Sequence, residues 1–201
     1  MKELIVSLDL ELNQPSGRIV QIGAVLGNIR TGEIVSRFDC LVDPGEPFCE
    51  CVAELTGIRP EALAQAPLLP LAVSRLEQWL SPYEKLRFRN ALVWGGGDTE
   101  TLRREMGVDP ERWIFGRRWI DVKTIYVAWR MAQNKDVTGG LARAMTKFGL
   151  AFQGRKHNAV DDALNTFRLY RVLLEQFKPT GQPITQQEAR PESAVSVGAL
   201  N

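Results

Sequence analysis

Apolar and polar residues alternate along the first part of the chain in the pattern typical of β-strands. In residues 3–12, three leucines fall on one face of the predicted strand, whereas Asp9 and Glu11 fall on the other. Two further apolar runs follow within residues 18–42, and the Thr31-Gly32 pair between them predicts a turn. The first 42 residues therefore predict three consecutive antiparallel strands.

After this point the apolar spacing changes to three and four residues, which is typical of helices. Between residues 53 and 80, Val73, Leu76, Trp79 and Leu80 form one apolar helical face. Residues 88–94 then predict a short buried strand, which three glycines end. The remaining pattern predicts, in chain order, a helix over 98–106, a brief strand running into a helix over 117–131, a helix over 141–148 and a last helix over 158–177.

The element order β-β-β-α-β-α-β-α-α predicts an α/β fold with a mixed five-stranded sheet, in which three antiparallel strands precede parallel ones and helices flank both faces. Residues 1–177 are expected to form one domain. Residues 178–201 are rich in Pro, Gln, Ser and Gly and contain no aromatic residue. We therefore predict a disordered C-terminal tail.

Composition excludes few classes of function. The chain has 25 basic and 24 acidic residues and a net charge of +1, which neither indicates nor excludes a nucleic-acid partner. The three cysteines and the single histidine match no familiar zinc spacing, so reduced thiols in a cytoplasmic protein are expected. Acidic residues interrupt the apolar N-terminus too early for a signal peptide, and no apolar run is long enough to span a membrane.

Asp9 and Glu11 are the first candidates for chemistry. Two carboxylates on one face of a central strand cost several kcal/mol unless a positive charge compensates them, and Mg²⁺ or Mn²⁺ prefers such ligands. An edge strand with a hydrated face is the alternative. Asp98 directly follows the glycines that end a strand. It is either a helix N-cap or a ligand at the end of the sheet where α/β folds bind them.

The stretch "KHNAVDDALNTF" holds the only histidine, His157, ahead of two aspartates. On the helical wheel Asp161 shares a face with Asn165 and Arg168, which predicts a solvated face. Asp162 lies at the border of the apolar stripe, where it is available to a site that the helix covers. Histidine is the side chain that titrates near neutral pH. The alternative is a surface histidine in a basic loop.

Together these residues resemble the site of a known family, the DEDDh-type 3′→5′ exonucleases. These enzymes have the RNase H-like fold and include proofreading exonucleases, RNase T and oligoribonuclease. The similarity covers residues 3–177 and extends to the segments "IVQIGAV" and "LTGI". The five residues that carry it, in chain order, are Asp9, Glu11, Asp98, His157 and Asp162.

The resemblance implies that the four acidic residues hold two divalent metal ions, Mg²⁺ or Mn²⁺, and that His157 deprotonates the attacking water. The implied substrate is the 3′ end of single-stranded RNA or DNA, and the implied products are nucleoside 5′-monophosphates. Leu55 and Thr56 of "LTGI" would contact the base and sugar of the terminal nucleotide. Arg155 and Lys156, which flank His157, are candidate phosphate contacts.

The chain departs from many relatives at Leu12, where a small or hydroxyl residue is common, and this change could alter how the 3′ end is held. The form "WGGGD" is similar to an exoribonuclease-like branch and favours RNA slightly over DNA. Two rival functions remain open: a catalytically idle nucleic-acid-binding module of the same fold, and an RNase H-like endonuclease. The sequence leaves the oligomeric state undecided.

Overall fold

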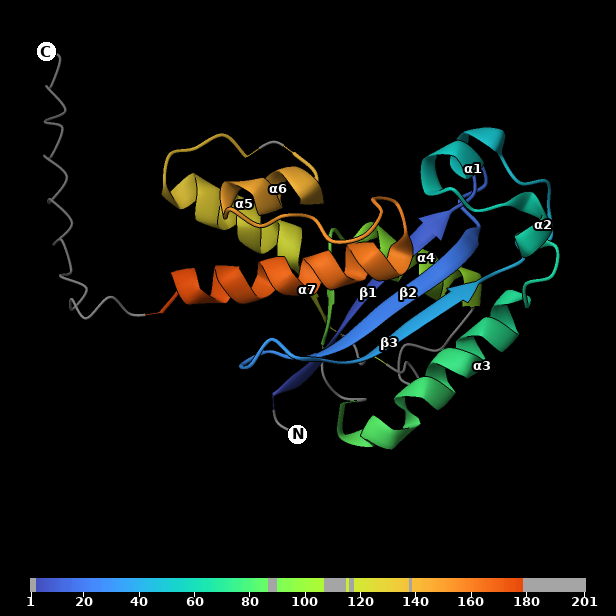
Figure 1. Ribbon diagram of the computed structural model, residues 1–201, viewed down its shortest axis with the longest axis horizontal. Coiled ribbons are helices and arrows are strands. Elements are labelled where there is room, and N and C mark those ends of the chain that lie inside the picture. Colours follow the sequence, from blue (N-terminus) through green and yellow to red (C-terminus); the bar gives the residue numbers. More distant parts are fainter. Residues whose placement is uncertain (1–2, 87–89, 107–114, 116–117, 138, 179–201) are drawn as a thin grey trace, which may run out of the picture.

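A computed structural model describes residues 3–86, 90–106, 115, 118–137 and 139–178 (Figure 1). A five-stranded mixed sheet forms its centre, with the strand order β3-β2-β1-β4-β5. The strands, in chain order, are β1 (Leu4–Leu12), β2 (Ile19–Asn28), β3 (Ile34–Leu41), β4 (Ala91–Val93) and β5 (Trp119–Asp121). The sheet confirms the predicted α/β fold class.

β1 is the central strand, as its sequence suggested. It pairs antiparallel with β2, which in turn pairs antiparallel with β3. On its other side β1 pairs parallel with β4, and β4 pairs parallel with β5. The carboxyl ends of β1 and β4 therefore meet at the same edge of the sheet, where ligands bind in folds of this kind.

The described helices confirm most of the predicted order. Their bounds, in chain order, are α1 (Glu50–Thr56), α2 (Pro60–Leu63), α3 (Leu69–Leu80), the 3₁₀ helix η1 (Ser81–Leu86), α4 (Gly97–Met106), α5 (Val122–Ala132), α6 (Leu141–Lys147) and α7 (Ala159–Gln176). The helical spacing predicted over residues 53–80 is divided into three helices. Gly57 ends α1 in the left-handed conformation, and prolines begin both α2 and α3.

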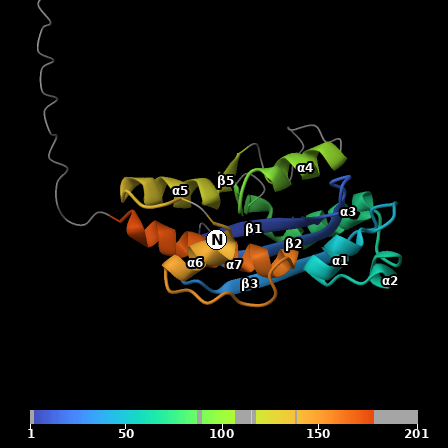
Figure 2. The same ribbon diagram turned by 90° about the horizontal axis from the view of Figure 1, so that it is seen from above.

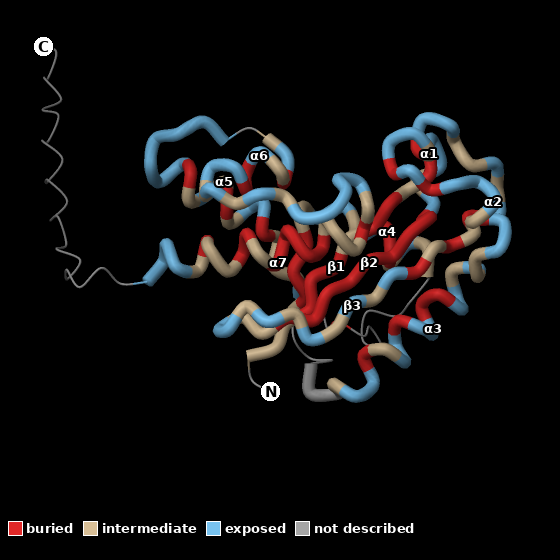
Figure 3. The backbone as a smooth tube through the Cα atoms, in the orientation of Figure 1, coloured by how far each residue is buried: buried red, intermediate tan, exposed pale blue. Residues whose placement is uncertain are grey.

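The two faces of the sheet differ in what covers them. Val6, Leu8 and Leu10 of β1 pack in one core cluster with buried residues of α3 and α4. The opposite face carries Ser7, Asp9 and Glu11, because side chains alternate along a strand. On that side α7 lies alongside β1 and β2 in both ribbon views (Figures 1 and 2). Figure 3 shows most of β1, β2 and α7 as buried, whereas β3 at the edge of the sheet is largely intermediate or exposed.

α7 packs unusually close to β2 at two glycines. A Cβ atom at Gly23 would lie 2.1 Å from the backbone of Ala159, and one at Gly27 would lie 2.4 Å from the ring of Phe167. Because no side chain intervenes, the first turn of α7 lies directly on the strand next to Asp9 and Glu11. Gly23, the glycine in "IVQIGAV", thus allows the start of α7 to pack closely against β2.

The cysteines are partly as expected. Cys40 is buried and free, but Cys49 and Cys51 form a disulfide at the start of α1, which contradicts the expectation of reduced thiols throughout. The helical turn brings their Cα atoms to 5.4 Å, a separation that a disulfide can span. None of the described helices is long and apolar enough to cross a membrane. The predicted tail, apart from Lys178, lies outside the described residues.

Candidate active site

Two strand ends supply the first three acidic groups. Asp9 and Glu11 point from the same face of β1, and Asp98 lies in the first turn of α4. The glycine turn between β4 and α4 is held by Asp121, whose Oδ1 accepts a hydrogen bond from the Gly95 backbone N–H at 3.1 Å. Gly95 has a φ of 98°, a left-handed conformation that favours glycine. The turn therefore brings Asp98 back toward the end of β1.

The start of α7 supplies the other two groups. The Asn158 side chain caps the helix by accepting a hydrogen bond from the Asp161 N–H. Asp162 follows in the first turn, and its Oδ2 accepts a hydrogen bond from the His157 backbone N–H at 3.0 Å. One potential ligand atom from each of Glu11, His157 and Asp162 lies within 4.8 Å of the others. Glu11 and His157, which are 146 positions apart in sequence, therefore lie close together in the fold.

All five predicted residues line one cavity of about 500 Å³. Its walls also include the aromatic side chains of Trp94 and Phe152 and the cationic side chains of Arg143 and Lys156. Sequence reasoning missed Trp94, Phe152 and Arg143. Their only sequence signal was proximity to a predicted site residue or glycine turn. The cavity combines an acidic floor with aromatic and basic walls.

Burial raises the pKa of each of the four carboxyl groups on the acidic floor. Burial, with the charges of Asp98, Asp162 and Glu11, raises the pKa of Asp9 well above its usual value. Burial, followed by the charges of Asp162 and Asp98, raises the pKa of Glu11 to about 8. Burial and the Asp162 charge raise the pKa of Asp98 to about 7. Burial raises the pKa of Asp162 to about 6, although the hydrogen bond from His157 opposes this shift.

Four carboxyl groups that repel one another in a buried site fit divalent cations. Hard oxygen ligands suit Mg²⁺ and Mn²⁺, and bound cations would reverse the unfavourable charge balance. Acidic clusters on a protein surface are hydrated and need no bound cation. Glu11 is only 9% exposed, so water does not compensate its charge in this way. The donor set can hold a divalent cation, and Asp9, Glu11, Asp98 and Asp162 stay the predicted metal ligands.

Gln21 of β2 holds the start of α7 in place. It is buried beside Glu11 in the strand register, and its Oε1 accepts a hydrogen bond from the Ala159 N–H at 3.1 Å. Its Nε2 donates to Oδ1 of Asp39 at 2.7 Å. Gln21 thereby satisfies one of the free N–H groups at the helix start. The available sequence signal for this role was a polar residue, Gln21, inside the apolar run "IVQIGAV" of the predicted strand.

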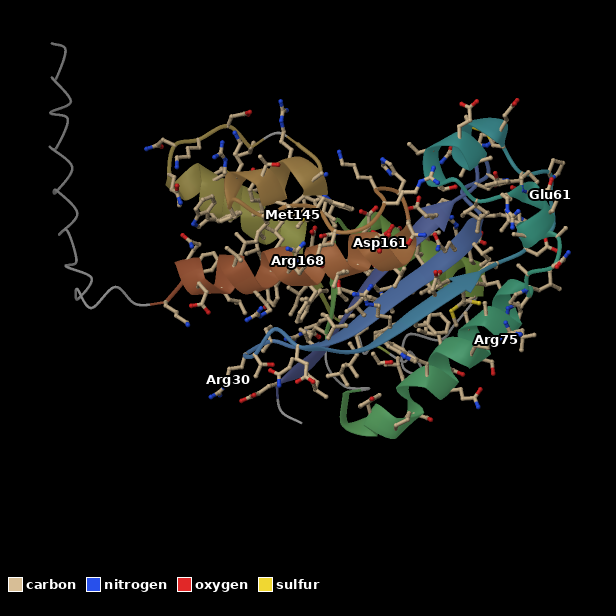
Figure 4. The ribbon with its side chains drawn as sticks, in the orientation of Figure 1. Arg30, Glu61, Arg75, Met145, Asp161 and Arg168 are labelled. Carbon is tan, nitrogen blue, oxygen red and sulfur yellow. A yellow bond between two sulfur atoms is a disulfide. The ribbon has the colours of Figure 1, made fainter. Side chains whose placement is uncertain are left out.

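The predicted solvated face of α7 is wrong. Asn165 is fully buried, because the loop of residues 151–157 folds over this face. Asn165 Nδ2 donates to the backbone oxygens of Gln153 and Asp161, while Nη1 of Arg168 donates to Ala151 O. Figure 4 shows Asp161 near the end of α7 where this loop rises and Arg168 further along the helix. The polar face therefore anchors the loop that carries His157.

Of the five predicted substrate-binding residues, one lines the cavity and four do not. Lys156 lines the cavity, but Leu12, Leu55, Thr56 and Arg155 are absent from its described lining. Leu12 is partly buried against the core on the opposite face of the sheet, because the alternation of β1 turns it away from Glu11.

The other three residues are linked to one another. Thr56 is buried, and its hydroxyl donates to Val52 O at 2.7 Å, which engages it within α1. Leu55 is 52% exposed. Arg155 donates to the Leu55 carbonyl oxygen instead of pointing into the cavity. The sequence pattern did not reveal these contacts.

An acidic cluster at the carboxyl ends of β1 and β4, with an imidazole beside it, is the arrangement of metal-dependent nucleases with an RNase H-like sheet. The sequence matches the family model described as Exonuclease over residues 6–170. The chain belongs to this exonuclease family.

Individual relatives agree with this assignment. The chain is 29% identical over 175 residues to mouse ERI1 exoribonuclease 2, a match that covers 75% of this chain and 24% of the mouse protein. It is 28% identical over 170 residues to the 3′-5′ exonuclease Snipper of Drosophila melanogaster, covering 73% of this chain and 57% of the fly protein. The chain thus spans about a quarter and just over half of these relatives.

Solved structures share the fold. The nuclease domain of 3′hExo, a DEDDh family member bound to rAMP, superimposes with a TM-score of 0.74 at 21% identity, covering 87% of this chain and 93% of that domain. The cell-death related nuclease CRN-4 gives a TM-score of 0.75 at 16% identity, covering 87% of this chain and 64% of that structure. At these identities the likeness is one of fold.

Proposed function

We propose that this chain is a metal-dependent 3′→5′ exonuclease that hydrolyses single-stranded nucleic acid from its 3′ end and releases nucleoside 5′-monophosphates. We assign this activity to residues 1–177. The observation that carries the proposal is the cavity in which four carboxyl groups of raised pKa meet the only histidine of the chain. Membership of the exonuclease family supports it.

In this proposal Asp9, Glu11, Asp98 and Asp162 hold two divalent ions, Mg²⁺ or Mn²⁺. Such ions, when bound, supply Lewis acidity and stabilise negative charge that develops on the phosphoryl oxygens. Asp162 has a second task, because its carboxylate fixes the backbone of His157. The exposed His157 imidazole accepts the proton of the attacking water, a role typically worth 10²–10⁴ in rate.

The walls of the cavity suggest how a strand is bound. Lys156 and Arg143 are placed to contact phosphates, and the rings of Trp94 and Phe152 offer surfaces for bases. Stacking and phosphate contacts do not discriminate between bases, since every base has an aromatic face and every linkage a charge. Cleavage is therefore expected to tolerate most sequences.

RNA is proposed as the slightly preferred substrate. The mouse relative carries the name exoribonuclease, whereas the fly relative is named only as a 3′-5′ exonuclease. The form "WGGGD" favours the same choice. Rates on RNA and DNA single strands of identical sequence test the preference, and a faster rate on DNA would reverse it.

The activity itself is tested with a 5′-labelled single strand and Mg²⁺ or Mn²⁺. We expect a ladder that shortens one nucleotide at a time, stops with EDTA and is blocked by a 3′-terminal phosphate. Cleavage of a circular strand would instead identify an endonuclease. Binding of the strand without metal-dependent shortening would identify a catalytically idle binding module.

A further inference from the structure

Arg155 reaches from the loop before α7 to the C-terminal end of α1. Its Nη2 donates hydrogen bonds to the backbone oxygens of Glu54, at 3.3 Å, and Leu55, at 3.4 Å. The last carbonyl groups of a helix lack donors within the helix, and a cation suits the negative end of the helix dipole. Arg155 therefore caps α1 from a position 100 residues away in the sequence.

Gly57 makes this contact possible. It follows α1 with a φ of 70°, and its N–H donates to Ala53 O at 2.7 Å. A Cβ atom at position 57 would lie 1.5 Å from Nη1 of Arg155. The guanidinium group therefore packs directly onto the glycine backbone, and any side chain at this position would displace it.

The backbone of Arg155 is fixed to the other wall of the site. Its N–H donates to Oδ2 of Asp161 at 2.8 Å, and two residues later the His157 N–H donates to Asp162. His157 has a φ of 59°, which is uncommon for a residue other than glycine and requires support from its surroundings. The first turn of α7 thus holds the loop, and the side chain of Arg155 connects that loop to α1.

α1 needs such an external support. It has seven residues and rests on a small apolar cluster rather than on the main core. The buried members of that cluster are Val20, Val52, Ile58 and Leu63. Leu55, at the end that Arg155 caps, exposes about half of its surface and is therefore accessible to a substrate base.

We propose that Arg155 is a positioning residue that sets the place of Leu55 and the end of α1 relative to His157. A terminal nucleobase held against Leu55 then brings its own 5′ phosphodiester to the imidazole and the acidic cluster. This inference rests on the proposed exonuclease function. It replaces the predicted role of Arg155 as a phosphate contact, because Nη2 of Arg155 donates to two carbonyl oxygens at the end of α1.

The test compares Arg155→Ala with Lys156→Ala, the neighbouring cation that does line the cavity. Each variant is assayed with Mg²⁺ on a strand that has a normal 3′ nucleotide and on one that ends in an abasic residue. Misplacing reacting groups by about 1 Å can cost about 10²-fold, so we expect Arg155→Ala to lower kcat at least about tenfold on the normal end. On the abasic end the loss should be less than about threefold, because no base is positioned there.

Lys156→Ala should instead raise KM on both strands and weaken its salt dependence, as loss of a phosphate contact does. Arg155→Lys keeps a cation but loses the planar fork, and we expect a kcat between wild type and Arg155→Ala. If Arg155→Ala only raises KM and weakens its salt dependence, as Lys156→Ala does, Arg155 is a phosphate contact and the inference is wrong.

Hydrogen exchange separates this inference from the proposed function. The Gly57 amide should exchange faster in Arg155→Ala than in wild type or Lys156→Ala, whether or not the protein is active. An inactive wild-type protein would refute the proposed function but leave this comparison intact. Unchanged exchange at Gly57 would overturn the connection between the two walls.

Discussion

Replacing Glu11 by Gln is expected to stabilise the metal-free protein while abolishing its activity. The pKa of Glu11 is raised from 4.5 to about 8 by burial and by the Asp162 and Asp98 charges. Glutamine resembles the protonated form of this group and carries no charge at any pH. The substitution therefore removes a buried repulsion but also removes a metal ligand.

The sign of the pH dependence follows from proton linkage. A carboxyl group with a raised pKa binds more protons in the folded state than in the unfolded state, so the free energy of unfolding falls as pH rises from about 4.5 to about 8. Each pKa unit corresponds to about 1.4 kcal/mol, which gives roughly 4–5 kcal/mol for Glu11 above pH 8. At pH 6 about 2 kcal/mol of this cost is present, and near pH 4 almost none.

Thermal unfolding in EDTA measures the difference between Glu11→Gln and wild type. A free-energy change of about 4 kcal/mol raises Tm by roughly 10 °C in a domain of this size, so we expect that gain at pH 9 and about half of it at pH 6. Saturating Mg²⁺ should stabilise wild type at pH 9 more than the variant. A variant that is less stable than wild type in EDTA, or equally stable at every pH, would refute this electrostatic reasoning.

Three further substitutions test the site and its support. Asp9→Ala should abolish hydrolysis with the fold retained by circular dichroism, and a wild-type rate would remove Asp9 from the mechanism. His157→Ala should lower kcat by about 10²–10⁴ while Mn²⁺ binding, followed by calorimetry, is kept, and unchanged turnover would overturn its role as base. Gly23→Ala would place a Cβ 2.1 Å from the backbone of Ala159, so we expect a loss of about 1–3 kcal/mol in unfolding free energy together with lower kcat. Equal stability and activity would show that α7 is free to shift.

The sequence predicted the parts of the fold that depend on local periodicity. Alternation in residues 3–12 correctly located β1 and put Asp9 and Glu11 on one face, and the glycines after β4 correctly located the turn before Asp98. Both features depend on neighbours in sequence. The shared cavity of the five site residues was predicted only through the family resemblance, because no local pattern reports contacts between distant segments.

What the sequence could not show depends on tertiary contacts. Asn165 has a polar side chain on a helix face, and only the loop folded over that face makes it buried. The position of Arg155 two residues before His157 suggested a phosphate contact, yet its guanidinium donates a hydrogen bond to a backbone oxygen of α1. The cysteine pattern did not reveal that a helical turn would bring Cys49 and Cys51 together.

The central claim, that four carboxyl groups jointly hold divalent cations, is tested most directly by counting bound Mn²⁺. Titration at pH 8 with a saturating nucleoside 5′-monophosphate should give two Mn²⁺ ions per wild-type chain, and Asp162→Ala should lose at least one of them while Asp161→Ala keeps both. Mn²⁺ binding that is absent from wild type, or identical in all three proteins, would contradict the account.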